Sequence, residues 1–310
     1  MRKSIPLILA ALLVVPVAAE ATNDNVGTAG FSFLKVPVGA RASALGGTFT
    51  AVSGDLEATA TNPAGLVGVK ERTAALSLTS YLVDTEAGFL SFAVPGDRRL
   101  WAISVNYFSF GEMVRTDEDG QNLGTFNAFD FAAYITAAQK VWSNRLTLGV
   151  NFKAIYSSID DFTSDAYAVD LGVLSPGPID GMTLGASLSN LGSVRNGYTH
   201  GFEDSLPVVF KAGFSHRPAH TPVPLLLLVD INVPNDNDPF FSFGAEIQLA
   251  GDLYLRPGYS LQQTGAAGDD PLGLSAGGGV VVKKMYHVDY AFTSFPDLGD
   301  VHRLSVTGSF

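Results

Sequence analysis

The chain has 310 residues, of which 46% are hydrophobic, only 16% are charged and none is cysteine. Its formal charge of −11 argues against a nucleic-acid-binding protein, which needs a basic footprint, and the absence of cysteine excludes disulfide frameworks, thiolate metal sites and cysteine catalysis. The 33 glycines, 21 phenylalanines and 10 tyrosines favour β-sheet over a helix bundle.

Residues 1–21 have the pattern of a cleaved signal peptide. Arg2 and Lys3 precede an apolar core over 5–17, and small residues follow it. The core is shorter than the ~20 residues of a spanning helix, which argues against an uncleaved membrane anchor. The longest later apolar run, 225–229, ends at Asp230. We therefore expect an exported protein that is either soluble or crosses a membrane with β-strands.

Residues 22–72 show no strand-like alternation and are predicted to form an N-terminal hatch. Short helical turns are expected over 39–47 and 55–60, and the sequence of 62–66 indicates a turn. About fifty residues can fold inside a wide barrel, and large barrels are often plugged. The candidate gate residues of this hatch are Arg41, Gly46, Gly47, Asn62, Pro63 and Gly65. The alternative is that the turn only packs the plug.

Apolar and polar residues alternate persistently from residue 73 to the end of the chain. The alternation predicts strands over 73–82, 87–94, 100–110, 127–142, 146–159, 164–176, 181–191, 207–218, 225–234, 240–251, 253–262, 272–282, 285–295 and 300–310. An even number of strands is expected of a closed outer-membrane barrel. The predicted fold is therefore all-β: a 14-stranded antiparallel transmembrane β-barrel over 73–310, with the hatch inside its lumen.

The composition of the two strand faces indicates which solvent each face meets. The polar faces are rich in Gly, Ser and Thr, whereas an exposed soluble sheet would carry many Lys and Glu. An Arg or Lys facing lipid at the midplane costs ~2–4 kcal/mol, so charges on the polar faces are expected to pair across the lumen. These lumen charges are Lys153, Asp170, Lys211, Asp230, Glu246, Arg256, Asp289 and Arg303. A soluble periplasmic β-sandwich would also alternate and is the competing fold.

The lengths of the gaps between strands predict the orientation. The even-numbered gaps are short, and the two longest, 111–126 and 192–206, are both odd-numbered. Because outer-membrane barrels have short periplasmic turns and longer outer loops, the odd gaps are expected outside. The candidate partner-binding residues in these two loops are Asp117, Asp119, Arg195 and Tyr198. Trp101 and Trp142 then fall at the periplasmic rim as an interfacial belt, the alternative being a hydrophobic core.

The sequence carries no recognisable catalytic, cofactor or metal motif. It has no H-E-x-x-H, no G-x-S-x-G and no phosphate loop ending in Gly-Lys-Ser/Thr. His216 and His220 are separated by Pro218, which breaks the helix that would align them. The acidic segments 117–120 and 235–238 are either calcium loops or, because the full pattern of a calcium loop is incomplete, ordinary solvated turns. The glycines of 277–279 indicate a strand kink or a close approach to the hatch. We expect a non-enzymatic protein without cofactor or metal.

Two segments of the hatch resemble the opening of the PorV/PorQ family, which belongs with the FadL-like channels. They are Phe31-Ser32-Phe33-Leu34-Lys35-Val36-Pro37-Val38-Gly39-Ala40-Arg41-Ala42-Ser43-Ala44-Leu45-Gly46-Gly47 and Asn62-Pro63-Ala64-Gly65-Leu66. Later stretches, including 107–111, 149–157 and 189–192, resemble PorQ more than PorV. The resemblance implies a fourteen-stranded barrel with a hatch in the outer membrane of a Gram-negative cell, in contact with its lipid.

The same resemblance implies two possible functions. PorQ-type proteins are components of the type IX secretion system, so the expected partners are secretion-system surface proteins held by the outer loops. FadL-like relatives instead pass hydrophobic small molecules, and that alternative predicts an apolar pocket near Phe31, Phe33, Leu34 and Phe49. In either case Arg41 and Glu57 are expected to pair with lumen charges and to lock the hatch.

Overall fold

The computed structural model describes residues 25–83, 85–96, 99–142, 145–199, 204–262, 272–295 and 299–310. The predicted signal peptide lies outside these residues. Within the described ranges, no helix has the length and apolarity to cross a membrane.

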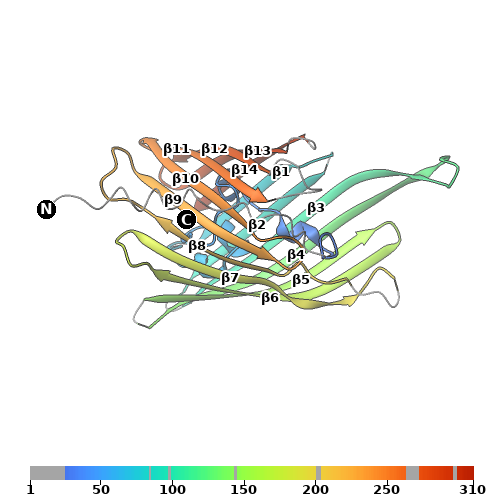
Figure 1. Ribbon diagram of the computed structural model, residues 1–310, viewed down its shortest axis with the longest axis horizontal. Coiled ribbons are helices and arrows are strands. Elements are labelled where there is room, and N and C mark those ends of the chain that lie inside the picture. The colour runs from blue at the N-terminus through green and yellow to red at the C-terminus, as the bar shows by residue number, and fades with distance from the viewer. Residues whose placement is uncertain are drawn as a thin grey trace.

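Fourteen antiparallel strands form a closed barrel, as the alternation predicted (Figure 1). Each strand pairs with its neighbours in sequence, and β1 closes the ring by pairing with β14. The strands are β1 Thr73–Ser80, β2 Glu86–Pro95, β3 Leu100–Thr116, β4 Asn122–Val141, β5 Leu146–Ile159, β6 Phe162–Pro176, β7 Met182–Asn196, β8 Val209–His216, β9 Leu225–Pro234, β10 Phe240–Ala250, β11 Leu253–Gln262, β12 Leu272–Val282, β13 Tyr286–Phe295 and β14 Gly299–Ser309.

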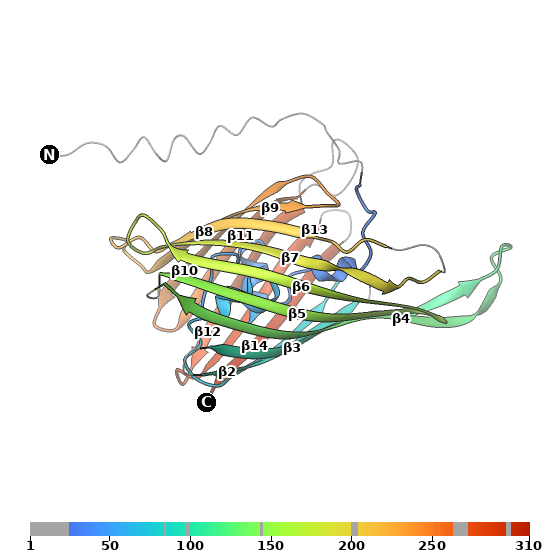
Figure 2. The same ribbon diagram turned by 90° about the horizontal axis from the view of Figure 1, so that it is seen from below.

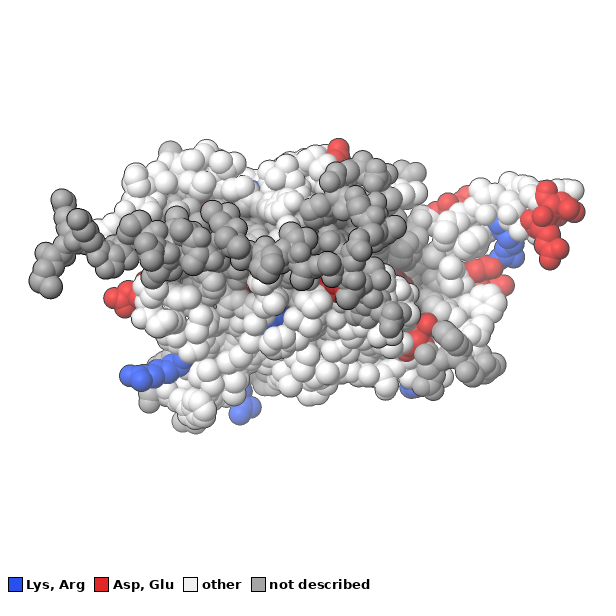
Figure 3. All heavy atoms as spheres, in the orientation of Figure 1, with Lys and Arg blue, Asp and Glu red and all other residues white. Residues whose placement is uncertain are grey.

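The apolar strand faces point outward and the polar faces point into the lumen. In β5, Leu148 and Phe152 are 47% and 60% exposed, whereas Asn151 and Lys153 are buried. This arrangement is the reverse of a soluble sandwich, whose apolar faces are buried between two sheets. The sandwich alternative is therefore wrong, and the outward surface is suited to acyl chains. Where Figure 3 shows the wall between its two ends, few charged residues are visible on it.

The loop predicted over 111–126 is instead the end of a long hairpin. β3 and β4 continue to Thr116 and Asn122, and their hairpin projects beyond the other strands (Figures 1 and 2). Gly111, where the sequence suggested the strand ends, adopts a positive φ of 73° within a register shift between Ser109 and Glu112. A glycine in this conformation is typical of a β-bulge, which bends a strand without ending it.

Both tryptophans lie on the outer surface near the end of the barrel that carries the short turns. Trp101 is the second residue of β3 and is 49% exposed. Trp142 directly follows the last residue of β4 and is 79% exposed. The core alternative for these residues is wrong. Their positions fit an aromatic belt at a membrane interface.

The segment before β1 lies inside the barrel, where Figure 2 shows it enclosed by the strands. It contains the short helices η2 Ser32–Lys35, α2 Ala40–Ala44, η3 Glu57–Ala60 and η4 Pro63–Leu66. At its N-terminal end, Ala29 forms a β-bridge with Ser205, which lies in the segment between β7 and β8. At its C-terminal end, the carbonyl of Arg72 accepts a hydrogen bond from the amide of Phe310. Residues 29–71, called the plug below, therefore run through the lumen from the outer loops to the short turns.

Candidate functional site

The turn formed by η4 is held directly against the barrel wall. Asn62, which is fully buried, accepts a hydrogen bond from the amide of Ala64 at 3.1 Å and donates to the carbonyls of Thr50 at 2.7 Å and Val173 at 3.2 Å. Pro63 occupies the first position of the helix, where its missing N–H leaves no bond unmade. Asn62 thus joins two parts of the plug to β6.

Glycines on the inner wall allow this close approach. A Cβ atom at Gly149 would lie 2.1 Å from the nitrogen of Ala64, and one at Gly172 would lie 2.0 Å from Oδ1 of Asn62. On the opposite wall, a Cβ atom at Gly277 would lie 2.5 Å from that of Ala44, so the close approach predicted for 277–279 is present there. The glycine-rich polar faces thus fit the plug backbone to the wall.

The predicted gate glycines also have backbone and packing roles. Gly46 and Gly47 follow α2 with positive φ values of 68° and 75°, and their amides donate to carbonyls of the preceding helix. Such residues end helices without the steric cost that a Cβ atom would add. A Cβ atom at Gly65 would lie 2.6 Å from that of Ala58. These positions fit the packing alternative, and a gating role for them stays a prediction.

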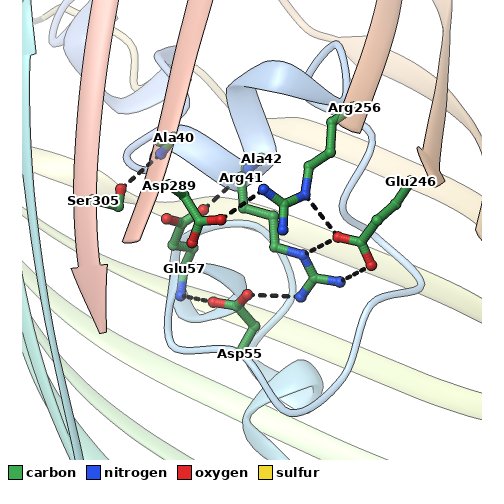
Figure 4. Close-up of polar contacts among 9 residues, drawn as sticks. All are labelled: Ala40, Arg41, Ala42, Asp55, Glu57, Glu246, Arg256, Asp289 and Ser305. Carbon is green, nitrogen blue, oxygen red and sulfur yellow. Dashed lines mark hydrogen bonds and ion pairs between the residues drawn. The ribbon is translucent and has the colours of Figure 1, made fainter. Parts of the chain in front are cut away.

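A network of five charged residues joins the plug to β10, β11 and β13 (Figure 4). The guanidinium of Arg41 donates to both carboxylate oxygens of Glu246, at 2.8 and 2.9 Å, and to Asp55 at 2.9 Å. Arg256 in turn donates to Glu246 at 2.7 Å and to Asp289 at 2.6 Å. The expected pairing of Arg41 with a lumen carboxylate is therefore present, in the bidentate geometry that makes such bonds strong.

The charges around Arg41 keep it ionised despite its position inside the barrel. Burial alone would lower the pKa of its guanidinium, but Glu246 and Asp55 outweigh burial and raise that pKa above its ordinary value. The network borders a cavity of about 590 Å³, which is also lined by residues of the short turns such as Arg217 and Lys284. We call this cavity the vestibule. Arg41 therefore lines the vestibule as an ionised side chain that is paired with two carboxylates.

Glu57 does not form the expected pair with a lumen cation. Its Oε2 instead accepts a hydrogen bond of 3.0 Å from the amide of Ala42, at the start of α2, and its side chain occupies the space beside Gly39. A Cβ atom at Gly39 would lie 1.8 Å from the carboxyl carbon. The two arginines of the network have other partners: Arg41 donates from its three nitrogens to Asp55 and Glu246, and Arg256 donates to Glu246 and Asp289.

The burial of Glu57 without an ion-pair partner among the described residues predicts a pH-dependent plug. Burial, with the nearby Asp55 carboxylate, raises the pKa of Glu57 to about 8 from 4.5. The neutral acid is therefore favoured in the folded plug, and its contribution to stability, full below pH 4.5, is lost as the pH rises through 8. We expect protease resistance of the plug to fall between pH 5 and pH 9 and this dependence to flatten in Glu57→Gln. An unchanged pH profile in that variant would contradict the assignment.

A second polar cluster joins β5, β6 and β7 to the plug. Lys153 pairs with Asp170 at 2.7 Å and donates to Oδ1 of Asn190 at 2.7 Å. Asn151 donates to Asp170 at 2.9 Å and to the plug carbonyl of Thr59 at 2.6 Å. The predicted charges meet here, but the two asparagines were not singled out from the sequence. Asn151 lies on the polar face of β5, where the sequence offered a signal, whereas Asn190 reaches the lumen through a register shift in β7 with a φ of 64°, which alternation does not predict.

The remaining predicted lumen charges also lie inside the barrel. Asp230 accepts hydrogen bonds from the amides of Phe49 and Thr50 and from the hydroxyl of Thr50, at 2.7–3.0 Å. Lys211 is half-buried and borders a cavity of about 70 Å³. Arg303 is 3% exposed and contacts the ring of Tyr81, with its guanidinium carbon 5.9 Å from the ring centroid.

The four candidate partner-binding residues have different environments. Asp117 and Asp119 lie in the exposed turn of the β3–β4 hairpin. Oδ1 of Asp117 accepts hydrogen bonds from the amides of Asp119 and Gln121. Arg195 belongs to β7 and pairs with Asp165 at 2.6 Å. Tyr198 hydrogen-bonds to the buried hydroxyl of Ser157, so its polar end is directed into the barrel, and its role in partner binding stays a prediction.

The apolar pocket expected in the plug is filled by side chains. Phe31, Phe33 and Phe49 are buried, the first two in a cluster that includes wall residues such as Phe108. The cavities beside Phe33 and Leu34 measure about 10 and 70 Å³. A cavity of roughly 150 Å³ is known to admit benzene, so neither holds an aromatic hydrocarbon in this conformation. The larger apolar groove, of about 650 Å³, is bordered by outward residues of β5, β6 and β8 such as Leu148, Leu171 and Phe210.

Comparison with known proteins identifies the family. The UPF0164 family, described as an uncharacterised protein family, matches residues 11–165, half of the chain. The chain belongs to the UPF0164 family. No curated protein matches this UPF0164 chain.

Within the described residues, no group of three or more His, Cys, Asp or Glu is placed to hold a metal ion.

Several solved structures share the fold of this UPF0164 protein. The toluene transporter TodX of P. putida superposes with a TM-score of 0.63 at 15% identity, covering 88% of this chain and 98% of its own. The toluene transporter TbuX of Ralstonia pickettii gives 0.62 at 14% identity, covering 92% and 99%. The CymD monoaromatic hydrocarbon channel gives 0.63 at 16%, covering 89% and 98%. The chain thus has the barrel fold of outer-membrane hydrocarbon transporters.

Proposed function

We propose that this UPF0164 protein is a non-enzymatic outer-membrane barrel that holds partner proteins at the cell surface. The observation that carries the proposal is the combination of a plug that runs through the lumen, bonded at both ends, and a hairpin that projects beyond the barrel. A plugged lumen suits a rigid support better than an open pore, and rigid supports present binding residues on their loops.

The projecting β3–β4 hairpin is the proposed binding element. Val114 and Leu123 are 59% and 61% exposed on it, and its turn carries the exposed acidic residues Asp117, Glu118 and Asp119. Acidic side chains accordingly gather at the far end of the hairpin in Figure 3. Exposed apolar residues rimmed by charge are typical of protein-binding surfaces.

The resemblance to the PorV/PorQ family supports a more specific role. In that role the barrel is a component of type IX secretion, and the partners are surface proteins of the secretion system. The resemblance also supports export by the predicted signal peptide and residence in the outer membrane of a Gram-negative cell. The outward apolar wall is compatible with lipid there.

Shortening the hairpin tests the binding role. Replacing residues 111–127 with Asn-Gly joins Phe110 to Ala128 by a two-residue turn that suits adjacent strands. We expect the barrel to insert normally and co-purification of partner proteins from detergent extracts to fall at least tenfold. Shortening the 217–224 turn at the opposite end is the matched control and should leave co-purification unchanged. Full retention of partners by the hairpin variant would contradict the proposal.

A passive channel for hydrophobic small molecules is the second candidate function. The shared fold with two toluene transporters and a monoaromatic hydrocarbon channel favours it. In this candidate function the plug moves to connect the vestibule with the outer mouth, because the cavities around Phe33 and Leu34 are too small for such a ligand. Uptake of labelled toluene into vesicles containing the purified protein, saturable and above that of protein-free vesicles, would favour the channel over the support.

A further inference from the structure

Arg303 is a buried cation that lacks the partners given to its counterparts. Its side chain is 3% exposed, and its Nε is buried without a hydrogen-bond partner. Within the described part of the chain it forms no ion pair. By contrast, Arg41, Arg256 and Lys153 each lie within 3.0 Å of a carboxylate oxygen. A guanidinium inside a barrel without an anion is strongly unfavourable, so this position calls for a compensating group.

Arg303 borders a cavity of about 100 Å³ between the plug and the wall. The cavity lies toward the outer ends of β11 and β13, where Gln262 and Phe295 contribute to its lining, and is bounded on the plug side by Val36 and Pro37. Its volume is that of roughly three water molecules. A small anion fits this space, whereas the acyl tail of a fatty acid does not.

The other polar groups of the cavity suit an anion as well. Ser260, Gln262 and Thr293 supply hydroxyl and amide groups to its lining, and each can donate a hydrogen bond. The carboxylates of the nearby network are already engaged, Glu246 by Arg41 and Arg256 and Asp289 by Arg256. Glu57 lies close enough to act on Arg303 electrostatically, but the two form no ion pair in the described residues, and the raised pKa of Glu57 favours its neutral form. No described carboxylate is therefore paired with Arg303.

We propose that Arg303 and this cavity form a binding site for a small monovalent anion, a halide or a free carboxylate of acetate size. The anion neutralises the guanidinium and accepts hydrogen bonds from the polar lining, so it binds between the plug and the β11–β14 wall. Bound anion therefore stabilises the closed position of the plug. Acetate and nitrate also match the planar fork of a guanidinium.

Thermal unfolding of the detergent-solubilised protein tests the site. The reference salt is sodium gluconate, because gluconate is too large for the cavity. It is replaced by sodium acetate, nitrate or chloride at constant ionic strength. We expect the midpoint temperature to rise saturably by a few degrees with the small anions, and the rise to vanish in Arg303→Met. The exposed Arg145→Gln variant is the matched control and should keep the rise. Equal midpoints in all salts, or an equal rise in Arg303→Met, would overturn the proposal.

A second measurement needs no variant. Crystals of the wild-type protein grown in sodium bromide should show an anomalous bromine peak within hydrogen-bond distance of the Arg303 guanidinium. Ordered water in the cavity, with no bromine signal at saturating bromide, would overturn the anion site and leave Arg303 hydrated.

Discussion

Replacing Arg41 with methionine is expected to release the plug from the vestibule wall. The substitution removes the bonds to Glu246 and Asp55 and leaves both carboxylates without this cation. Breaking a buried ion pair by removing one partner costs about 3–5 kcal/mol. Because the Arg41 and Glu246 side chains retain 17% and 9% exposure, we expect a loss near the lower end, about 3 kcal/mol.

Conductance and proteolysis measure this release together. In planar bilayers, Arg41→Met should conduct ions at least several-fold better than the wild type, and its plug should be cut faster by added protease. Lys70→Met is the matched control, because Lys70 is an exposed cation on the same vestibule. Unchanged conductance together with unchanged proteolysis in Arg41→Met would show that the network does not hold the plug.

Adding one methyl group to the inner wall at Gly149 is expected to displace the same plug by a steric route. The new Cβ atom would lie 2.1 Å from the Ala64 nitrogen and 2.3 Å from the Pro63 carbonyl carbon, and backbone cannot yield as a flexible side chain does. Overpacking of this kind costs typically 1–3 kcal/mol. We expect Gly149→Ala to form a barrel whose plug is cleaved about tenfold faster by protease.

Gly88→Ala is the matched control for this steric prediction. Gly88 lies in β2, and its added Cβ atom would have its nearest neighbour, the Ser77 carbonyl oxygen, at 4.0 Å. The same chemical change there should leave the cleavage rate unchanged. A wild-type rate in Gly149→Ala would mean that the η4 turn shifts along the wall without loss of packing.

The strand pattern could be predicted from the sequence because the lipid-facing surface imposes strict alternation. Leu148 and Phe152 must face outward and Asn151 and Lys153 inward, and this periodicity locates strands even without homologous sequences. The hairpin at 111–126 was missed because Gly111 interrupts the pattern, whereas in three dimensions it forms a bulge through which β3 continues.

Interactions within the lumen were only partly predictable. The sequence places Arg41 in a hatch and Glu246 on a polar strand face. Because opposite charges in a confined interior attract, their ion pair could be predicted. The partner of Glu57 could not be predicted in this way, because its bond to the amide of Ala42 depends on how the plug folds back on itself. Similarly, the hydrogen bond of the Tyr198 hydroxyl to Ser157 could not be predicted. It depends on the path of the loop after β7, and the alternation of apolar and polar residues gives no information on loops.

Collision of spin labels with oxygen and with a water-soluble nickel chelate tests the central claim, that the apolar strand faces meet acyl chains. The chain has no cysteine, so Phe152→Cys and Leu171→Cys label single outward positions, and Val114→Cys labels the projecting hairpin. In lipid vesicles we predict that labels at 152 and 171 collide readily with oxygen and rarely with the nickel chelate, while the label at 114 shows the opposite. Nickel accessibility at 152 and 171 equal to that at 114 would contradict a membrane-spanning barrel.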